Sequence, residues 1–473
     1  MDSRFRGNDV IIDAVLIRFV ALAFRPACAD PSLRSGQALE VGATSKLGHT
    51  RLLDSSTPRL LDCRVPSFRK GGGHRMPKAR QLVCSKSKWQ GREAYSLSNG
   101  RIQMVNFTGG GHIAELRFAE GSGLPALNPL WNPPWKTIEP FQYKARSHAK
   151  RYGPLTEGKL LSGIAGHNIC LDYFGPPSEA ETAQGLSTHG EAPNLKWRRS
   201  AERLRGGQLT VTFSVRLPEA GLEFSREIGM RAGEAVVHLK ETVTNQRKLD
   251  HFFHWTQHVT LGPPFVSSED TRVFMSATKG ITSSEAYGEQ ALLAFGKEFQ
   301  WPLAPSSGGG EADLSHCLIL KGFGVVASLL ADPSRHAQFV GALNTRERLL
   351  IAYCFRRSDY PWITIWEENC SREAPPWNSR TETRGLEFGS APLPVTRQEA
   401  FARGSLLGTP TFSTVPARDR LTATYVAFLA HLPEGFNEVR DISLGKDEIR
   451  VHGKESGQVV SVPASGIAAA GLA

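Results

Sequence analysis

Residues 208–244 read QLTVTFSVRLPEAGLEFSREIGMRAGEAVVHLKETVT, and this stretch decides the fold class. Apolar and polar residues alternate over residues 208–217, 222–228 and 235–244, which is the pattern of strands with one buried face. The two intervening segments are rich in proline, glycine and other turn residues. Strands that recur about every twelve residues between such turns are typical of a β-sandwich or barrel, so we predict an antiparallel β protein.

The same alternation continues on both sides of this stretch. Residues 95–100 and 101–107 meet at Asn99-Gly100, a dipeptide typical of tight hairpin turns. Further segments with strand character are residues 316–320, 324–330, 349–355, 362–366, 385–388, 421–432 and 448–453. Only residues 147–151 and 395–402 favour short helices, and neither carries a long apolar stripe. We therefore predict an all-β fold, a large sandwich of two packed antiparallel sheets.

Composition and charge set the domain boundaries. The chain has 473 residues, of which 40% are hydrophobic and 22% charged, so disorder throughout and a multi-spanning membrane protein are excluded. Half of the net charge of +10 lies in residues 1–75, which hold 12 Lys and Arg against 7 Asp and Glu. That segment shows no sustained apolar period. We predict that residues 1–75 are a disordered or spurious extension before a start at Met76, and that residues 76–473 form one β-sandwich domain. Because this domain carries only +5, we expect no nucleic-acid partner.

Targeting signals and cysteines indicate the compartment. The apolar run of residues 10–24 is interrupted by Asp13 and Arg18, so it is too short and too charged for a membrane span and poor as a signal peptide. The seven cysteines are odd in number and form no CxxC pair. Their wide spacing fits neither a disulfide framework nor a structural zinc site. We expect reduced cysteines, a cytoplasmic location and no membrane partner.

Three polar clusters interrupt the alternation. The first contains His189-Gly190, the second contains His254 and His258, and the third contains Glu387 between two apolar residues. Each also fits an ordinary structural role. A histidine in a turn is commonly a surface hydrogen-bonding group, and a glutamate that alternates with apolar residues in a strand can simply face solvent. His254 and His258 have metal-ligand spacing, but Trp255 replaces the glutamate of an H-E-x-x-H site, so no metal is expected.

In this order, the three clusters resemble the aldose 1-epimerase (galactose mutarotase-like) superfamily. His189-Gly190 is similar to the first active-site His-Gly of the family, and His258 before Leu-Gly-Pro-Pro-Phe (residues 261–265) is similar to the central catalytic histidine. Glu387, within GLEFGSAPLP (residues 385–394), resembles the late strand that supplies the catalytic base, although Phe388 stands where proline is common. The separations of 69 and 129 residues are also similar, and the resemblance spans about residues 90–455.

The resemblance implies a galactose mutarotase-like supersandwich that interconverts sugar anomers by acid/base ring opening. One carboxylate and one imidazole suffice for this chemistry. Glu387 would take the proton of the anomeric hydroxyl as base, His258 would protonate the ring oxygen as acid, and His189 would hydrogen-bond the ring or anomeric oxygen. One of Glu367 and Glu368 is the second choice for the base. No metal or organic cofactor is needed.

Further residues are candidates for binding the sugar. Tryptophans stack on the apolar face of a pyranose, and the candidates are Trp131, Trp135, Trp255 and Trp366, with core packing as the alternative for each. His167, Asn168 and Asp172 follow a glycine-rich turn and would contact hydroxyl groups. Arg384 would either neutralise a sugar phosphate or uronate or hold Glu387 through an ion pair.

The sequence thus predicts a monomer or small homo-oligomer whose partner is a small-molecule sugar or sugar derivative. A carbohydrate-binding module of the same fold without turnover is the alternative function. A third possibility is a structural or interaction protein whose histidines are incidental. Under that third hypothesis, His189, His258 and Glu387 need not converge on one pocket.

Overall fold

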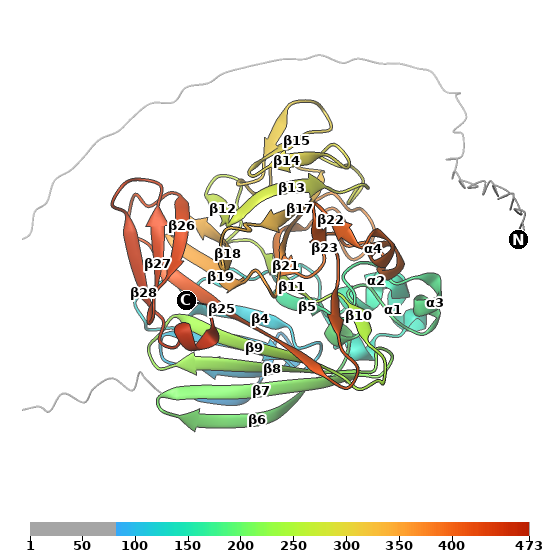
Figure 1. Cartoon of the computed structure of the whole chain (residues 1–473), viewed down its shortest axis with the longest axis horizontal. Helices are drawn as coiled ribbons and strands as arrows, with labels where there is room; N and C mark the ends of the chain where they lie inside the picture. The colour runs from blue at the N-terminus through green and yellow to red at the C-terminus, as the bar shows by residue number, and fades with distance from the viewer. Residues whose placement is uncertain (1–81, 473) are drawn as a thin grey trace, which may run out of the picture. The chain divides into compact units, whose positions relative to one another are not determined.

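The computed structural model describes residues 82–472, and Figure 1 shows how their strands and helices are arranged. All of the described residues belong to one compact unit. The extension predicted over residues 1–75 and the start predicted at Met76 lie outside the described residues.

Two antiparallel sheets dominate the described chain. In spatial order, the larger sheet consists of β1 (Val83–Trp89), β2 (Arg92–Ser98), β3 (Ile102–Phe107), β4 (Ile113–Phe118), β5 (His167–Cys170), β11 (Thr256–Leu261), β21 (Glu382–Gly389), β20 (Trp362–Asn369), β17 (Gly324–Ala331), β13 (Ala277–Thr282), β14 (Glu298–Gln300), β15 (Leu303–Pro305) and β16 (Glu311–Asp313). The smaller sheet consists of β12 (Thr271–Met275), β18 (Ala337–Asn344), β19 (Leu349–Arg356), β25 (Arg420–His431), β9 (Val236–Asn245), β8 (Leu222–Arg231), β7 (Gln208–Leu217) and β6 (Arg198–Arg205). The prediction of an all-β sandwich is confirmed.

Smaller elements surround the two sheets. Short pairings join β10 (His251–Phe253) to β24 (Ser413–Val415) and β22 (Ser405–Leu406) to β23 (Thr409–Pro410), while β26 (Val439–Leu444), β27 (Glu448–Gly453) and β28 (Val459–Pro463) form a separate three-stranded sheet. Single 3-10 turns occupy Pro140–Gln142, Ala192–Asn194 and Ala468–Ala470. Within residues 82–472, no helix has the length and apolar character needed to cross a membrane.

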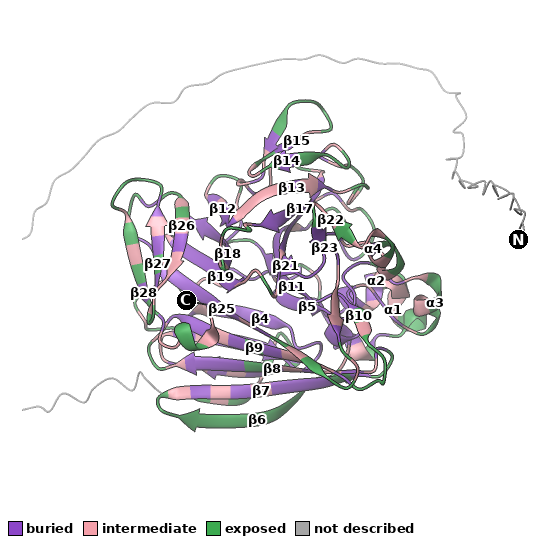
Figure 2. Cartoon of the chain, viewed as in Figure 1, coloured by how far each residue is buried: buried purple, intermediate pink, exposed green. Residues whose placement is uncertain are grey.

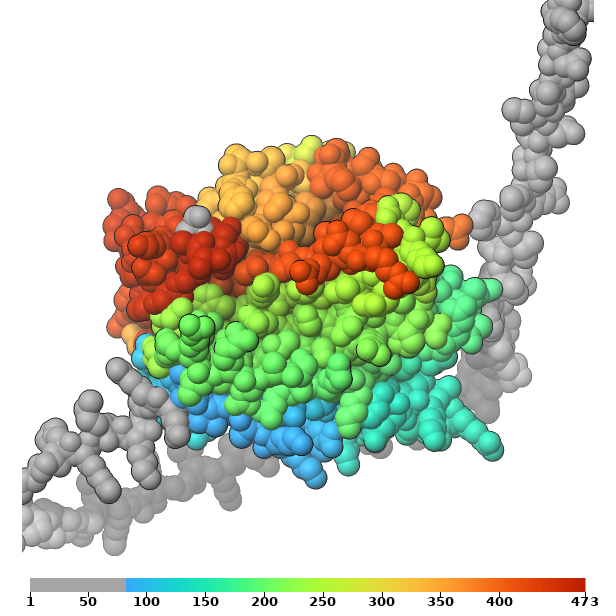
Figure 3. All heavy atoms as spheres, turned by 60° about the horizontal axis from the view of Figure 1, so that its bottom comes forward, coloured from blue at the N-terminus to red at the C-terminus, as the bar shows by residue number. Residues whose placement is uncertain are grey.

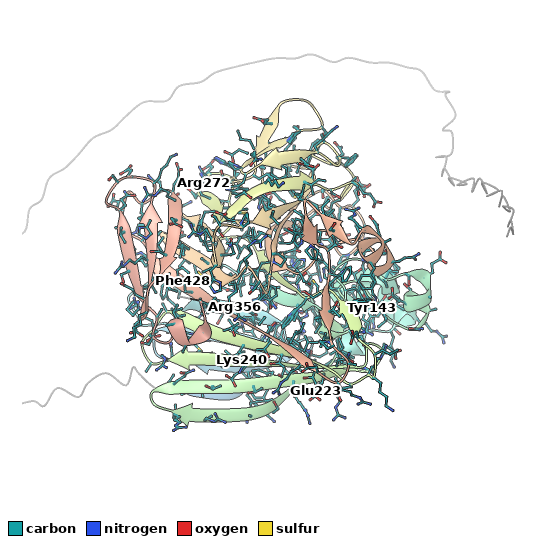
Figure 4. All side chains as sticks on the ribbon, in the orientation of Figure 1. Tyr143, Glu223, Lys240, Arg272, Arg356 and Phe428 are labelled. Atoms are coloured by element: carbon teal, nitrogen blue, oxygen red, sulfur yellow. The ribbon has the colours of Figure 1, made fainter. Side chains whose placement is uncertain are left out.

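The stretch that decided the fold class forms β7, β8 and β9, as predicted. Val211, Ile228 and Leu239 stand in one register row and are buried, because alternate residues point into the core. In the neighbouring row Glu227 pairs with Lys240, and Lys240 is exposed on the outer face of the sheet. Phe428, on the adjacent strand β25, is fully buried. Figure 4 labels both residues. The alternation in the sequence therefore corresponds to one face against the core and one against solvent (Figure 2).

The hairpin predicted at Asn99-Gly100 joins β2 and β3. The Asn99 side-chain oxygen accepts hydrogen bonds from the backbone N–H groups of Arg101 and Ile102 at 3.0 and 2.9 Å. Gly100 has φ of +79°, which a residue with a Cβ adopts only with strain. These contacts show why this dipeptide makes the turn.

Residues 82–472 contain four short α-helices outside the sheets, two more than predicted. The helices α1 (Ala145–Tyr152) and α4 (Arg397–Arg403) correspond to the two predicted ones. The helices α2 (Leu155–Leu161) and α3 (Glu179–Ala183) were not predicted because they are too short for a 3.6-residue period. Ser178 and Glu181 form a capping box at the start of α3, a sequence signal that identifies this helix.

A buried polar network and stacked aromatic rings join the two sheets. Phe355 of β19 and Phe388 of β21 stack at 4.4 Å between ring centroids, one ring from each sheet. The Glu241 carboxylate of β9 accepts hydrogen bonds from Arg226 Nε at 2.6 Å, Trp255 Nε1 at 3.0 Å and Gln257 Nε2 at 2.6 Å. Because Gln257 lies on β11, the network fixes this strand of the larger sheet to the smaller one.

Removing one of the stacked rings tests how the core is packed. We expect Phe388→Ala to lower the free energy of unfolding by about 3–5 kcal/mol, because the cavity left between the sheets is fully enclosed. Denaturant unfolding measures the change. Val459→Ala, at a strand residue that is 50% exposed, is the control and should stay within about 0.5 kcal/mol of the parent. Equal effects of the two substitutions would contradict the placement of Phe388.

Candidate active site

One row of polar side chains crosses the middle of the larger sheet. The pairing of β5, β11, β21 and β20 places Asn168, His258, Glu387 and Thr364 in register. Directly opposed residues point to the same face of a sheet, so these four side chains share one face. Asn168 is one of the residues predicted to contact sugar hydroxyl groups, and its buried amide has no hydrogen-bond partner among the described residues.

His258 and Glu387 are in direct contact within this row. The Nε2 atom of His258 lies 3.2 Å from Oε1 of Glu387, and Nδ1 lies 3.1 Å from the hydroxyl of Thr260, two residues along the same face. Both ring nitrogens of His258 are therefore held in place. The second carboxyl oxygen of Glu387 has no partner among residues 82–472.

His189 reaches the pair from the loop that follows α3. Its ring centroid lies 4.9 Å from that of His258, and its Nδ1 donates a hydrogen bond to the carbonyl oxygen of Phe174 at 2.5 Å. Because a carbonyl oxygen only accepts, Nδ1 carries the proton, and Nε2 of the neutral ring remains an acceptor. The structure thus brings together the three residues predicted to be catalytic.

Gly190 shows why glycine follows this histidine. Its φ is +79°, and a Cβ at this position would lie 2.4 Å from the carbonyl oxygen of Leu171. Only glycine fits, because the chain turns tightly against the end of β5. The turn places His189, itself at φ of +69°, beside His258.

Burial controls the protonation of all three residues. Loss of solvent raises the pKa of Glu387 well above its usual value and lowers the pKa of His258 well below its usual value, with a further lowering by His189. The pKa of His189 falls to about 4, chiefly through burial. Both imidazoles are therefore uncharged at neutral pH, and burial favours the protonated, uncharged form of the Glu387 carboxyl group.

A cavity of about 280 Å³ opens in front of the three residues. Its apolar walls come from Leu160, Leu161, Ile164, Phe174, Val326, Trp366 and Trp377. The ring of Trp366 lies edge-on to His258 at 5.6 Å. Aromatic walls next to acid/base groups suit a pyranose, which has apolar C–H faces and a rim of hydroxyl groups.

Two predicted tryptophans support the cavity without lining it. Trp131 stacks on Trp377 at 6.2 Å and Trp135 packs against the same ring at 5.3 Å, so they hold Trp377 from behind. Trp255 lies on the other face of the sheet, where its Nε1 binds Glu241. Of the four predicted tryptophans, only Trp366 is among the lining residues.

The other predicted binding residues do not reach the cavity. His167 points into the inter-sheet core, where its Nε2 lies 3.0 Å from the side-chain oxygen of Gln257. Asp172 is buried in contacts with His251 Nε2 at 2.8 Å and Arg397 at 2.7 Å. Neither His167 nor Asp172 is among the residues that line the cavity.

The remaining charged candidates are not among the residues that line the cavity. Arg384 lies on the opposite face of β21 from Glu387 and pairs with Glu367 at 2.9 Å. Glu368 accepts hydrogen bonds from the backbone N–H of Ser371 at 2.6 Å and from its hydroxyl at 2.9 Å. Neither the anion-binding role of Arg384 nor the second choice for the base fits this placement.

Polar residues that the sequence did not indicate complete the cavity wall. Arg372 stacks over Tyr287 at 4.0 Å and lies 5.0 Å from the ring centre of Trp377. Its guanidinium also lies 3.5 Å from Glu157 and 3.8 Å from Glu368. Arg372, Tyr287 and Trp377 come from irregular segments without a period, and no sequence signal identified them. No group of His, Cys, Asp and Glu within residues 82–472 is arranged to hold a metal ion.

Comparison with known proteins supports the fold. No protein-family model matches the chain, and no curated protein matches its sequence. A solved structure from Klebsiella pneumoniae, described as a "putative aldose 1-epimerase", superposes with a TM-score of 0.53 at 16% identity, over 75% of this chain and 85% of that one. The chain has the aldose 1-epimerase fold. A galactose mutarotase-like protein from Clostridium acetobutylicum gives a TM-score of 0.49 at 11% identity, over 74% and 99% of the two chains.

Within this fold, a substitution at Gly190 tests how His189 is positioned. We expect Gly190→Ala to destabilise the chain by about 1–3 kcal/mol and to displace His189, because the new methyl group meets backbone atoms. Gly185→Ala is a matched control on the same loop, with φ of +86° but open space around it. Thermal unfolding and the His189 NMR signals report the two effects, and an unmoved His189 signal in Gly190→Ala would contradict this role of the glycine.

Proposed function

We propose that this protein interconverts the anomers of a sugar by acid/base opening of the pyranose ring. The observation that carries the proposal is the 3.2 Å contact between His258 and Glu387, with His189 beside it, at the wall of a cavity lined by tryptophan. Ring opening requires one group that removes a proton and one that supplies a proton a few ångströms away. The pair provides both.

Ring opening starts from the single proton that the pair holds. The anomeric hydroxyl donates a hydrogen bond to Glu387, which stabilises the charged form of this carboxyl group. The carboxyl proton of Glu387 then passes to Nε2 of His258. Glu387 then removes the proton from the anomeric oxygen while His258 protonates the ring oxygen. The C1–O5 bond breaks, the aldehyde forms, and the pair returns to its uncharged form.

Ring closure runs through the same atoms in reverse. After rotation about the C1–C2 bond, the aldehyde presents its other face to the hydroxyl of C5. His258 removes the proton from this hydroxyl as it attacks C1, and Glu387 protonates the aldehyde oxygen. The His258–Glu387 pair is thus in its uncharged form, which burial favours, while the sugar is an open-chain aldehyde.

In this proposal His189 accepts a hydrogen bond from the sugar. Its Nδ1 proton is engaged by Phe174 and its pKa is about 4, so its free Nε2 accepts a hydrogen bond at neutral pH. It is suited to accept from a sugar hydroxyl and orient the ring. Trp366 and Trp377 would cover the apolar faces, and Arg372 offers N–H donors to further hydroxyl groups.

Replacing the base tests the function directly. Exchange NMR on a panel of neutral and charged aldoses, added to the full chain, measures the rate of α/β interconversion. We expect Glu387→Gln to lower kcat/KM by about 10²–10⁴-fold, because the amide cannot remove a proton. Glu434→Gln, at an exposed residue, is the control. Equal rates in both variants would exclude Glu387 from the reaction, and sugar binding without any exchange would identify a binding module.

The pH dependence tests the one-proton pair. Catalysis needs one proton shared by His258 and Glu387, so kcat/KM falls when the pair gains a second proton or loses its only one. Burial lowers the pKa of His258, so the acid limb of the kcat/KM profile lies below about pH 6.5. Burial raises the pKa of Glu387, so the alkaline limb of the same profile lies above about pH 4.3. We therefore expect no increase of kcat/KM as the pH rises above about 6.5. A rate that increases through pH 6.5 from a low value would contradict the neutral resting pair.

A further inference from the structure

A cationic groove lies on the molecule away from the candidate active site. It follows the two strands β1 and β6, which are the outer strands of the larger and the smaller sheet on the same side of the sandwich. All eight residues of β6 are exposed, whereas most residues of the neighbouring β7 are buried (Figure 2). Figure 3 turns this side toward the viewer, with the green strands from β6 onward above the blue N-terminal strands.

The groove concentrates positive charge. It has a volume of about 700 Å³, and its lining includes the five cations Lys86, Lys88, Lys196, Arg198 and Arg199 but the single carboxylate Glu93. Residues 82–472 as a whole hold 42 Lys and Arg against 39 Asp and Glu, a net charge of +3. The net +4 of the groove therefore exceeds that of the entire described chain.

The cations belong to both sheets and face each other. Lys86 stands opposite Tyr95 in the β1–β2 register, and Tyr95 is buried, so Lys86 points to the inter-sheet side. On β6, Arg199 stands opposite the buried Phe213 and also points inward. The guanidinium of Arg199 lies 5.0 Å from the ring centre of Tyr95, which shows that the two edges meet.

Contacts within the groove balance only part of this charge. Lys196 pairs with Glu93 at 3.2 Å, and Arg199 pairs with Glu202. Lys86 and Lys88 form no ion pair with any residue that the structure describes. They lie two residues apart on one face of β1, about 6.8 Å along the strand.

The backbone adds a second kind of recognition. As outer strands, β1 and β6 each pair with one neighbour and leave the N–H and C=O groups of their other edge without a strand partner among residues 82–472. Such an edge accepts an extended peptide as an additional strand. The groove can therefore hydrogen-bond to the backbone of an added peptide strand, and its positive charges select peptides with acidic side chains.

We propose that this groove binds an extended acidic peptide segment of another protein by strand addition.

Charge excludes two other occupants of the groove. A second copy of this edge would bring like charges together, which is how edge-strand lysines keep copies of a chain apart. Residues 1–81 of the same chain hold 14 Lys and Arg against 7 Asp and Glu, so their net positive charge does not complement that of the groove. The proposal does not depend on the proposed sugar chemistry.

Fluorescence anisotropy with the full chain tests the proposal. The probe is a labelled eight-residue peptide of alternating Glu and Thr, whose carboxylates all lie on one face of a strand. We expect binding that weakens with salt and at least a tenfold loss of affinity in the double variant Lys86→Glu, Lys88→Glu. The matched control, Lys248→Glu with Lys446→Glu, changes the net charge equally at exposed residues elsewhere and should bind as the parent does. Unfolding temperatures of both variants confirm that they fold.

Two further probes separate strand addition from charge attraction alone. A peptide of alternating Glu and Pro keeps the charge but lacks half of the N–H donors, and we expect it to bind at least tenfold more weakly. Heparin, a linear polyanion without a peptide backbone, tests a glycan as the occupant. Equal binding of the Glu/Pro peptide, tight binding of heparin without binding of the Glu/Thr peptide, or no binding of any probe would each overturn the proposal.

Discussion

The register of β11 between β5 and β21 is the constraint on which the rest of the structure depends. It places Asn168 on one side of His258 and Glu387 on the other, all on one face of the larger sheet. A shift by one residue would turn His258 into the inter-sheet core and bring Gln257 to the cavity. The hydrogen bond of Gln257 to Glu241 and the stacking of Phe388 on Phe355 oppose that shift. The core of the sandwich and the candidate site are therefore specified by the same strands.

Exclusion of water is the second physical effect that governs the site. The apolar walls that shape the cavity also remove solvent from His258 and Glu387, so each group favours its uncharged form. A shared proton between a neutral carboxyl group and a neutral imidazole costs less than a buried ion pair. The pair can then exchange that proton as the sugar opens and closes, with a change in charge only while the pyranose ring is engaged.

The sequence predicted what local periodicity and short motifs determine. Alternation located β7, β8 and β9, the Asn99-Gly100 turn located a hairpin, and the three polar clusters located residues that the fold brings together. Periodicity does not determine which face of a strand reaches the cavity. His167 and Asn168 are adjacent in β5, and only the register with β11 shows that His167 points to the core.

Partners distant in the sequence account for the other differences. Arg384 looked available for an anion because its partner Glu367 lies on the next strand of the sheet. Asp172 likewise meets Arg397 more than two hundred residues away. Arg372, Tyr287 and Trp377 lie on irregular segments, where neither helical nor strand period exists, so tertiary packing alone places them at the cavity.

Nitrogen-15 NMR of the His258 ring, followed against pH with and without sugar, tests the central claim most directly. A shared proton on the His258–Glu387 pair predicts a neutral imidazole at pH 7 in the free protein and a shift toward the protonated form when sugar binds. In Glu387→Gln the ring should stay neutral in both states. A His258 that is already cationic in the free protein, or that does not respond to sugar that binds the cavity, would contradict the acid/base role of the pair.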